Sequence, residues 1–282
     1  MVMKIQRSSF LAGCMLMLFC IFLAFFAAPA LGAASSIVCA STTSTQNTGL
    51  FDYLLPKFTE KTGIDVKVIA VGTGQALAMA KRGDADVLLV HAPEAEKKFI
   101  ADGYGLPRRE VMYNDFVILG PTDDPAGIKS MKSGPEAFAA IAKKGATFIS
   151  RGDDSGTNKK EMFLWKKAGV DPKGKPWYRE TGQGMSATLR IADEQKAYTL
   201  CDRATWLSMK ANIKPGFGLL VEGDPLFYNQ YSVIVVNPEK FPHLKTKEAQ
   251  IFADWLVSPE AQKLIGQFKD KNGNVLFHPN AK

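Results

Sequence analysis

The feature that most constrains the fold is a regular alternation of short β-branched runs with longer amphipathic segments. This alternation is typical of βαβ units, in which strands form a largely parallel sheet and helices cover its faces. In residues 48–62, for example, Leu50, Leu54 and Phe58 share one face of a helix. Gly63 follows at the position where a helix commonly ends. The sequence therefore predicts an α/β protein.

The same patterns give the extent of each element. We predict strands at residues 36–40, 65–70, 87–90, 115–120, 146–150, 198–201, 219–222 and 231–236. We predict helices at residues 48–62, 75–82, 93–102, 134–144, 158–168, 186–194, 204–210, 246–257 and 259–269. The sequence shows no internal repeat, which excludes a solenoid or a propeller.

Two segments are typical of connections between lobes rather than of interior strands. Residues 113–119 leave the first series of βα units, and residues 228–236 precede the closing helices. If the chain crosses on the first and returns on the second, lobe I comprises residues 35–119 with 232–282, and lobe II comprises residues 120–231. Two crossings suit a hinge that closes over a ligand. The alternative is one continuous α/β domain, which would show the same alternation.

The N-terminal residues match the pattern of a secretory signal peptide. Lys4 and Arg7 precede an apolar run over residues 10–28, and small residues follow it. We therefore predict a cleaved signal peptide at residues 1–33 and a periplasmic location. A transmembrane anchor is the alternative, because the run is close to the roughly 20 residues that a span needs.

The four cysteines fall into two groups. Leu11–Cys14 resembles a lipoprotein box, but a true box closes the apolar stretch, and here the stretch mostly follows it. Cys14 and Cys20 leave with the predicted signal peptide, so the mature chain keeps Cys39 and Cys201. These two can pair in an exported protein, or they can be buried and inert, which is the interpretation we favour.

The charge pattern excludes some classes of partner. The formal net charge is +7, of which the predicted signal peptide carries two, which leaves +5. A mildly basic protein attracts anions. Because basic and acidic residues are interleaved, with no arginine-rich stripe or zinc-finger spacing, we do not expect nucleic-acid binding. No cluster of histidine, cysteine and carboxylate residues has the spacing of a metal-cation site.

Four segments between a predicted strand and the next helix are rich in hydroxyl groups and glycine. In α/β sheets this edge carries the ligand site, where helix N-termini offer unpaired N–H groups and partial positive charge. The first is residues 41–49, Ser-Thr-Thr-Ser-Thr-Gln-Asn-Thr-Gly. Helix capping explains one of its five consecutive hydroxyl residues, but not the others. The second is residues 71–75, Val-Gly-Thr-Gly-Gln, which lacks the third glycine of a dinucleotide fingerprint.

The third segment, Ser-Arg-Gly-Asp-Asp-Ser-Gly-Thr-Asn over residues 150–158, points most strongly to a ligand. Its arginine, Arg151, can place a forked cation on an oxyanion. Ser155 and Thr157 add hydroxyl groups at a helix start. One of the two aspartates, Asp153 or Asp154, can orient the arginine. The alternative is an aspartate-capped helix with a surface ion pair.

The fourth segment is residues 182–188, Gly-Gln-Gly-Met-Ser-Ala-Thr. Two of the four segments fall in each predicted lobe, so a tetrahedral oxyanion held between the lobes would meet neutral donors and one arginine. Sulfate, molybdate and tungstate carry no proton near neutral pH. Hydrogen phosphate carries one and needs a carboxylate to accept it. Asp153 and Asp154 therefore keep phosphate as an alternative ligand.

An enzyme is the rival class, because Asp154-Ser155-Gly156 is similar to the nucleophile loop of a secreted serine hydrolase. A catalytic triad also needs a histidine base. The histidines at positions 91, 243 and 278 have no partner at a recognisable spacing, and neither G-x-S-x-G nor H-E-x-x-H occurs. We therefore predict a protein that is not an enzyme and has no cofactor. A periplasmic sensor of the same fold would differ only in its partner.

The chain resembles the TupA-type tungstate-binding components of ABC importers. The resemblance covers the mature chain in order and spacing, and residues 150–157 are its most specific part. Ser41 stands where the family often has a threonine. The residues that carry the resemblance are Ser41–Thr45, Val71–Gln75, Leu89–Glu94, Ser150–Thr157 and Gly182–Met185.

The resemblance implies a two-lobed α/β periplasmic-binding-protein fold of type II with two hinge crossings. It implies capture of tungstate, with molybdate or phosphate as alternatives, by a monomer that docks on an ABC permease in the inner membrane. Arg151 is associated in the family with holding the anion and with preferring tungstate, and Ser155 is a further candidate. The ligand-binding residues that match the motifs are Thr42, Thr43, Thr73, Arg151, Thr157 and Ser186.

Overall fold

The structure is a computed structural model that describes residues 35–282. The signal peptide predicted at residues 1–33 lies outside the described residues, as do Cys14 and Cys20. Within residues 35–282, no helix combines the length and the apolar character that crossing a membrane requires.

The described residues form a succession of strands and helices close to the predicted one. The strands are β1 (Ser36–Thr42), β2 (Asp65–Val71), β3 (Val87–Val90), β4 (Arg109–Pro121), β5 (Phe148–Ser150), β6 (Tyr178–Glu180), β7 (Thr199–Asp202), β8 (Phe217–Val221), β9 (Tyr228–Val235) and β10 (His278–Pro279). The α-helices are α2 (Thr43–Asn47), α3 (Leu50–Thr62), α4 (Thr73–Arg82), α5 (Pro93–Ala101), α6 (Gly134–Lys144), α7 (Gly156–Lys167), α8 (Met185–Glu194), α9 (Arg203–Met209), α10 (Thr246–Leu256) and α11 (Pro259–Gln267), with 3-10 helices η1 (Lys210–Asn212) and η2 (Pro225–Phe227). The short elements α2, β6 and β10 were not predicted.

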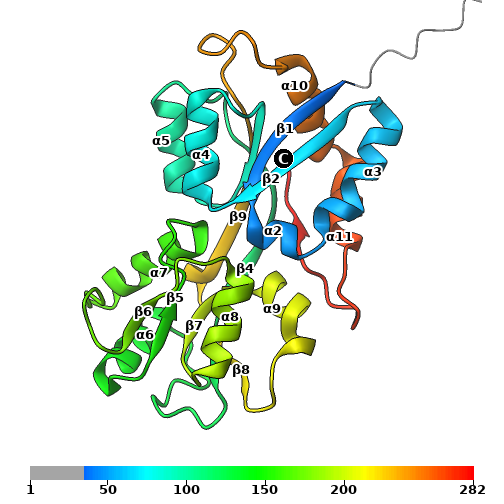
Figure 1. The fold of residues 1–282 in the computed structure, drawn as a ribbon. Helices are drawn as coiled ribbons and strands as arrows, with labels where there is room; N and C mark the ends of the chain where they lie inside the picture. The colour runs from blue at the N-terminus through cyan, green and yellow to red at the C-terminus, as the bar shows by residue number, and fades with distance from the viewer. Residues whose placement is uncertain (1–34) are drawn as a thin grey trace, which may run out of the picture. The chain divides into compact units, whose positions relative to one another are not determined.

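Two strands carry the chain between the halves of the fold. The first half of β4, Arg109–Asp115, pairs with β9, and its second half pairs with β7 and β8. Strand β9 pairs with β3 on its other side. Figure 1 shows β4 and β9 running between the group that contains β1 and the group that contains β7. The crossings predicted around residues 113–119 and 228–236 lie in these strands.

The main sheet is mixed, so the prediction of a largely parallel sheet was wrong. Strand β1 pairs in parallel with β2 and β3, but β9 runs antiparallel to both β3 and β4. The cause is the topology, because a chain that leaves on one strand and returns on its neighbour passes the hinge in opposite directions. The strand order β10-β4-β9-β3-β1-β2 therefore combines a parallel part with two crossing strands.

The first hydroxyl-rich segment is helical rather than a loop, which corrects the start of the helix predicted at residues 48–62. Helix α2 occupies most of it, and α3 begins at Leu50. Between them, Gly49 has a φ of 80°, a left-handed conformation that glycine adopts without steric cost. The Thr48 hydroxyl donates to the Thr45 carbonyl at 2.7 Å. This break turns the chain, so α2 and α3 are separate helices.

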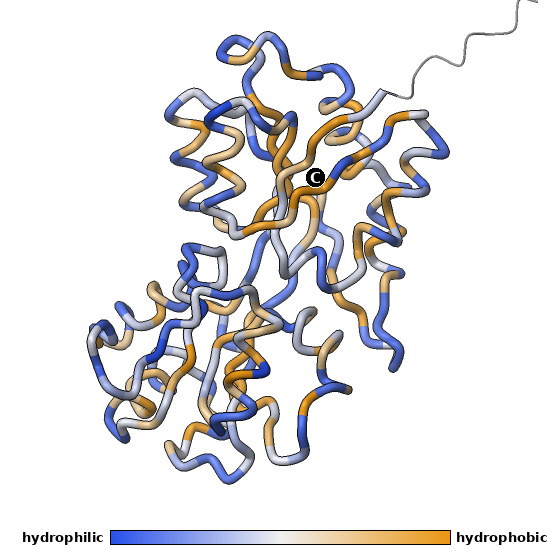
Figure 2. The backbone as a smooth tube through the Cα atoms, in the orientation of Figure 1, coloured by the Kyte–Doolittle hydropathy of each residue, from blue (hydrophilic) through white to orange (hydrophobic). Residues whose placement is uncertain are grey.

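The core residues separate into groups that follow the proposed lobes except near the crossings. There, Phe116–Leu119 pack with the lobe II groups, and Tyr231 and Ala204 pack with the lobe I group. In the first group, α4 and α5 pack on one side of the β1 sheet, and α3, α10 and α11 pack on the other (Figure 1). A second group lies within residues 116–227 and includes Phe138, Phe148 and Trp165. Figure 2 shows hydrophobic segments along the central strands and hydrophilic ones at the outer loops. We keep lobe I as residues 35–119 with 232–282, and lobe II as residues 120–231, as a proposal.

The two cysteines of the described chain are unpaired. Cys39 lies in β1 and Cys201 in β7, and both thiols are buried and free. Burial raises the pKa of Cys39 to about 12 and raises that of Cys201 well above its ordinary value. A buried thiol with a raised pKa has little thiolate and is unreactive, so both residues act as small hydrophobic side chains.

Candidate functional site

The hydroxyl groups around α2 divide into internal and outward ones. The Thr42 side chain caps α2 and lies 2.8 Å from Thr45 Oγ1, and the Ser41 hydroxyl donates to the Leu89 carbonyl at 2.6 Å. Thr42 thus fixes the end of β1 to α2, and Ser41 fixes it to β3. Thr43 is half-buried, and its Oγ1 lies 3.4 Å from Arg151 Nη2 of lobe II. Thr43 therefore reaches across the interface, whereas Thr42 is occupied mainly as a cap.

Arg151 is buried at the end of β5, and only 2% of its surface is exposed. Its Nη2 and Nε donate to Asp153 Oδ2 at 2.6 and 3.2 Å. Asp154 instead pairs with Lys159. Of the two aspartates that the sequence left open, Asp153 is thus the one that orients the guanidinium. The guanidinium keeps donors for a planar or tetrahedral oxyanion, because a fork has five N–H groups.

The buried side chain of Glu161 holds the backbone turn that carries Arg151. Ser150 donates to Glu161 Oε2 at 2.6 Å and accepts from the backbone N–H of Gly152 at 3.1 Å. Trp165 and Tyr178 also donate to Glu161, at 3.0 and 2.7 Å. Burial raises the pKa of Glu161 to about 7, although these hydrogen bonds oppose the shift. The network fixes the turn that aims Arg151.

Two predicted ligand residues have hydroxyl groups without a partner. Thr73 is the first residue of α4, Thr157 is the second residue of α7, and both are almost completely buried. Within residues 35–282, neither Oγ1 atom has a hydrogen-bond partner. A buried hydroxyl without a partner costs about 1–3 kcal/mol. Both side chains can therefore donate to a ligand at no loss of internal hydrogen bonds.

Glycine allows the lobes to approach closely at these helix starts. A Cβ on Gly74 would collide with Asp154 Oδ2, and a Cβ on Gly72 would lie 3.3 Å from the Asp153 carbonyl oxygen. The Gly74 N–H donates to the Asp154 carbonyl at 3.3 Å. A side chain at position 74 would displace the exposed Asp154 carboxylate and press on the Asp154 carbonyl oxygen, 3.1 Å from the Cβ position. The Val-Gly-Thr-Gly-Gln pattern is therefore a contact between lobes as well as a helix start.

The fourth segment meets the first. Asn47 of α2 donates to Ser186 Oγ of α8 at 2.8 Å, and both side chains are partly accessible. A Cβ on Gly184 would lie 3.5 Å from Thr43 Oγ1. Ser155 caps α7 by accepting from the Asn158 N–H at 3.2 Å, which leaves its hydroxyl hydrogen available. All four predicted segments therefore meet at one interface between the lobes.

The electrostatics of this interface favour a small anion. Three helices of ten or more residues, α4, α7 and α8, begin here, and helix N-termini carry partial positive charge. Arg151 adds a full positive charge, which Asp153 balances in part. Among residues 35–282, no group of histidine, cysteine and acidic side chains could hold a metal ion.

Sequence reasoning gave no site role to three buried polar residues beside this interface. They are His91, which follows β3, Asn114 in β4 and Asn229 in β9. His91 Nδ1 lies 3.0 Å from Asn229 Oδ1, and Asn229 Nδ2 donates to Asn114 Oδ1 at 2.7 Å. Two asparagines in the predicted crossing segments, residues 113–119 and 228–236, were the available signal. Their pairing depends on strand register, which the local pattern does not give.

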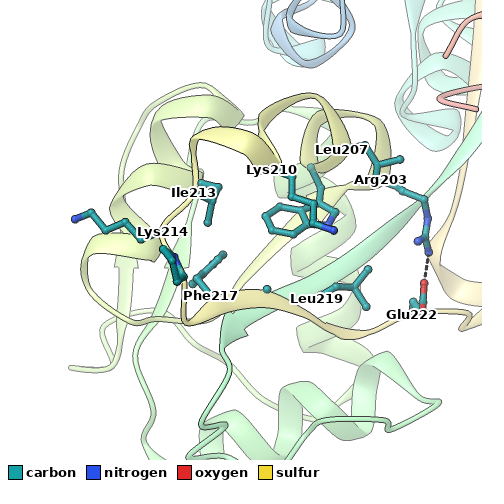
Figure 3. A pocket seen from close by; sticks show the side chains of 11 residues that line it. Arg203, Leu207, Lys210, Ile213, Lys214, Phe217, Leu219 and Glu222 are labelled. Atoms are coloured by element: carbon teal, nitrogen blue, oxygen red, sulfur yellow. Dashed lines mark ion pairs between the residues drawn. The ribbon is translucent and has the colours of Figure 1, made fainter. Parts of the chain in front are cut away.

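A separate pocket lies over α9, η1 and β8 in lobe II (Figure 3). Its volume is about 590 Å³, and Lys210, Ile213 and Phe217 are among its lining residues. An ion pair of 2.8 Å between Arg203 and Glu222 borders it. None of the predicted ligand residues lines this pocket, so it is distinct from the interface described above.

Two α/β lobes, joined by crossing strands and closed on a polar interface, define a solute-binding protein. Comparison with known proteins agrees, because a family model described as a PBP superfamily domain matches residues 27–260. The tungstate-binding protein TupA of Peptoclostridium acidaminophilum is 51% identical over 252 residues, which are 88% of this chain and 87% of that protein.

Two solved structures give the same result. The tungstate-binding protein TupA from Desulfovibrio alaskensis G20 is 49% identical with a TM-score of 0.76, and the match covers 88% of this chain and 100% of that one. A tungstate ABC transporter structure from Geobacter sulfurreducens is 50% identical with a TM-score of 0.75, covering 83% of this chain and 98% of that one. The chain therefore belongs to the PBP superfamily and, within it, to the TupA family. Membership confirms the predicted two-lobed fold and a transport component rather than an enzyme.

Proposed function

We propose that the protein captures tungstate between its lobes and delivers it to the permease of an ABC importer. Two observations carry the proposal: Arg151 contacts Thr43, and the hydroxyl groups of Thr73 and Thr157 are buried without partners in segments that meet at the same interface. Support for the choice of anion comes from relatives named for tungstate binding at about half identity.

The proposed ligand set keeps the residues predicted from the sequence. The guanidinium of Arg151 supplies the charge, and the hydroxyl groups and helix N-termini supply neutral donors. Hydrogen bonds from such donors offset the hydration that a buried dianion loses. Ser155 belongs to the set because its hydroxyl hydrogen is available. The complete proposed set is Thr42, Thr43, Thr73, Arg151, Ser155, Thr157 and Ser186.

The carboxylates at the interface argue against hydrogen phosphate. Its proton needs an acceptor, and Asp153 keeps only one of about four acceptor positions. Its Oδ2 accepts twice from Arg151, and its Oδ1 accepts from the Ser155 N–H at 3.2 Å. Asp154 pairs with Lys159 and is exposed. An anion without a proton fits this donor-rich site better. Molybdate has nearly the size and charge of tungstate and is the second candidate.

The remaining parts of the proposal concern the protein's place in the cell. We propose that residues 1–33 are a cleaved signal peptide, that the mature protein works in the periplasm as a monomer, and that its partner is an inner-membrane permease. The basic and apolar pattern of the first residues supports export. Membership of the TupA family supports the transport role.

Calorimetric titration of the purified mature protein with tungstate, molybdate, sulfate and phosphate tests the proposal. We expect one anion to bind per chain, with tungstate bound at least as tightly as molybdate and much more tightly than sulfate and phosphate. Tighter binding of phosphate than of tungstate would contradict it.

A further inference from the structure

The buried residue His91 connects the candidate site to the hinge. It follows β3, and only 3% of its surface is exposed. Its Nδ1 lies 3.0 Å from Oδ1 of Asn229 in β9, and its ring stacks on Tyr231 with centroids 4.6 Å apart. Asn229 pairs directly opposite Asn114 of β4 and donates to it at 2.7 Å. The contact chain therefore spans both crossing strands.

The hydrogen bonds of His91 fix its tautomer. Oδ1 of Asn229 can only accept, so Nδ1 of the ring carries the hydrogen and Nε2 is an acceptor. Ser44 Oγ of α2 lies 3.5 Å from Nε2, at the long end of a hydrogen bond, and is the donor. Burial lowers the pKa of His91 to about 4, so the ring is neutral near pH 7. A neutral ring in this tautomer gives Ser44 a fixed direction.

The same ring touches the helix start of the opposite lobe. A Cβ on Gly156, the first residue of α7, would lie 2.9 Å from His91 Cε1 and 3.1 Å from its carbonyl oxygen. Farther along α7, Lys160 donates to the carbonyls of Leu226 and Tyr228 at 2.8 and 3.2 Å, just where β9 begins. Helix α7 is thus attached to the hinge strand at its middle and rests on His91 at its first turn.

We propose that His91, Asn229 and Asn114 form a hinge relay that holds α2 and the first turn of α7 in register with the crossing strands. In the relay His91 is a positioning residue: it acts on the anion through Ser44, Gly156 and their neighbours Thr43 and Thr157. The effect on anion binding rests on the proposed function. The effect on the two helix starts does not.

The relay predicts a specific kinetic signature. The hydrogen bonds of the relay orient the His91 ring that meets Gly156 of the other lobe. Their loss lets the ring move, which shortens the life of the closed state more than it slows encounter with the anion. Interface changes of this kind act mostly on dissociation rates. We therefore expect faster release of tungstate with little change in the association rate.

Two variants and a control test the relay. His91→Phe keeps a ring over Tyr231 and under Gly156 but removes both nitrogens, and Asn229→Ala removes the central link. Asn237→Ala is the matched control, because Asn237 donates to the Gly103 carbonyl at 3.0 Å and has no hydrogen bond to α2, α7 or β4. Stopped-flow binding of tungstate and amide hydrogen exchange of the ligand-free protein are measured for each.

We expect about tenfold faster tungstate release in both relay variants and less than a twofold change in the control. We also expect faster amide exchange at residues 43–47 and 156–159 in the ligand-free relay variants, as local opening becomes easier. Unchanged exchange at both segments in both variants overturns the relay. If wild-type protein binds no tungstate, the proposed function fails, and the exchange result alone decides the relay. Slower association with unchanged release also overturns it.

Discussion

On the lobe I side of the candidate site, Thr43 and Thr73 offer neutral hydroxyl groups, whereas the lobe II side presents the guanidinium of Arg151 beside Asp153. Each lobe also contains a buried glutamate outside the predicted ligand set. Lobe I has the buried Glu96 in an ion pair of 3.0 Å with Arg108, and the buried Glu161 of lobe II accepts only from neutral donors. Arg151 and Glu96 therefore each have a partner of opposite charge, whereas Glu161 has only neutral partners. Variants of Arg151 should mainly change anion affinity, and variants of the two glutamates should mainly change stability.

The largest expected effect comes from the buried positive charge of Arg151. Arg151→Gln should weaken tungstate binding by about 2–5 kcal/mol, because it removes a buried charged contact and leaves Asp153 unopposed. Titration calorimetry measures the change. Arg203→Gln is the control, since Arg203 pairs with Asp115 and Glu222 away from the predicted ligand residues. An unchanged affinity in Arg151→Gln would show that Arg151 only stabilises its loop.

For the neutral hydroxyl groups of Thr73 and Thr157, we expect removal to lower anion affinity without lowering stability. Thr73→Val and Thr157→Val should each weaken tungstate binding by about 1–2 kcal/mol, through loss of a donor to the anion. The ligand-free protein should become equally or more stable, because each change removes a buried hydroxyl without a partner. Calorimetry and thermal unfolding measure the two effects.

The control for these variants is Thr199→Val. The Thr199 hydroxyl is buried and donates to the Ile149 carbonyl at 2.8 Å. Its loss should lower stability and leave anion affinity intact. If Thr73→Val and Thr157→Val behave like the control, the two hydroxyl groups are not ligand donors.

The sequence predicted the elements better than the contacts between them. Periodicity and end signals such as Gly63 placed the helices and strands, and the arginine motif placed Arg151 at the end of a strand, next to its aspartates. Local patterns could not choose between the aspartates, because the choice depends on the left-handed backbone of Asp154, with a φ of 57°. The direction of β9 and its pairing with β4 are non-local and were mispredicted with the parallel sheet. The role of His91 depends on that same pairing.

The buried glutamates Glu161 and Glu96 should make the stability of the protein depend on pH. Burial raises the pKa of both Glu161 and Glu96 to about 7, from an ordinary value of 4.5. A raised pKa in the folded state means stability that is present below about pH 4.5 and is lost as pH rises through 7. Glu161→Gln should therefore reduce the loss of stability between pH 5 and 8, by about 1–3 kcal/mol.

Glu96→Gln should differ from Glu161→Gln at pH 8. It leaves Arg108 without its buried carboxylate, so stability should fall rather than stay level. Denaturant unfolding at pH 5 and pH 8 measures both variants, with the exposed Glu194→Gln as the control. Equal pH dependence in Glu161→Gln and the wild-type protein would mean that Glu161 stays ionised throughout this range.

The smallest expected effect concerns the rim of the site, where Asn47 of lobe I donates to Ser186 of lobe II. Asn47→Ala removes one accessible hydrogen bond between the lobes, and its net contribution should be at most about 1 kcal/mol. Ser186→Ala removes the same bond and, in the proposed ligand set, a donor to the anion as well. Its loss of tungstate affinity, measured by calorimetry, should therefore exceed that of Asn47→Ala. Equal losses would mean that Ser186 bridges the lobes without touching the anion, and the double variant would then lose no more affinity than either single one.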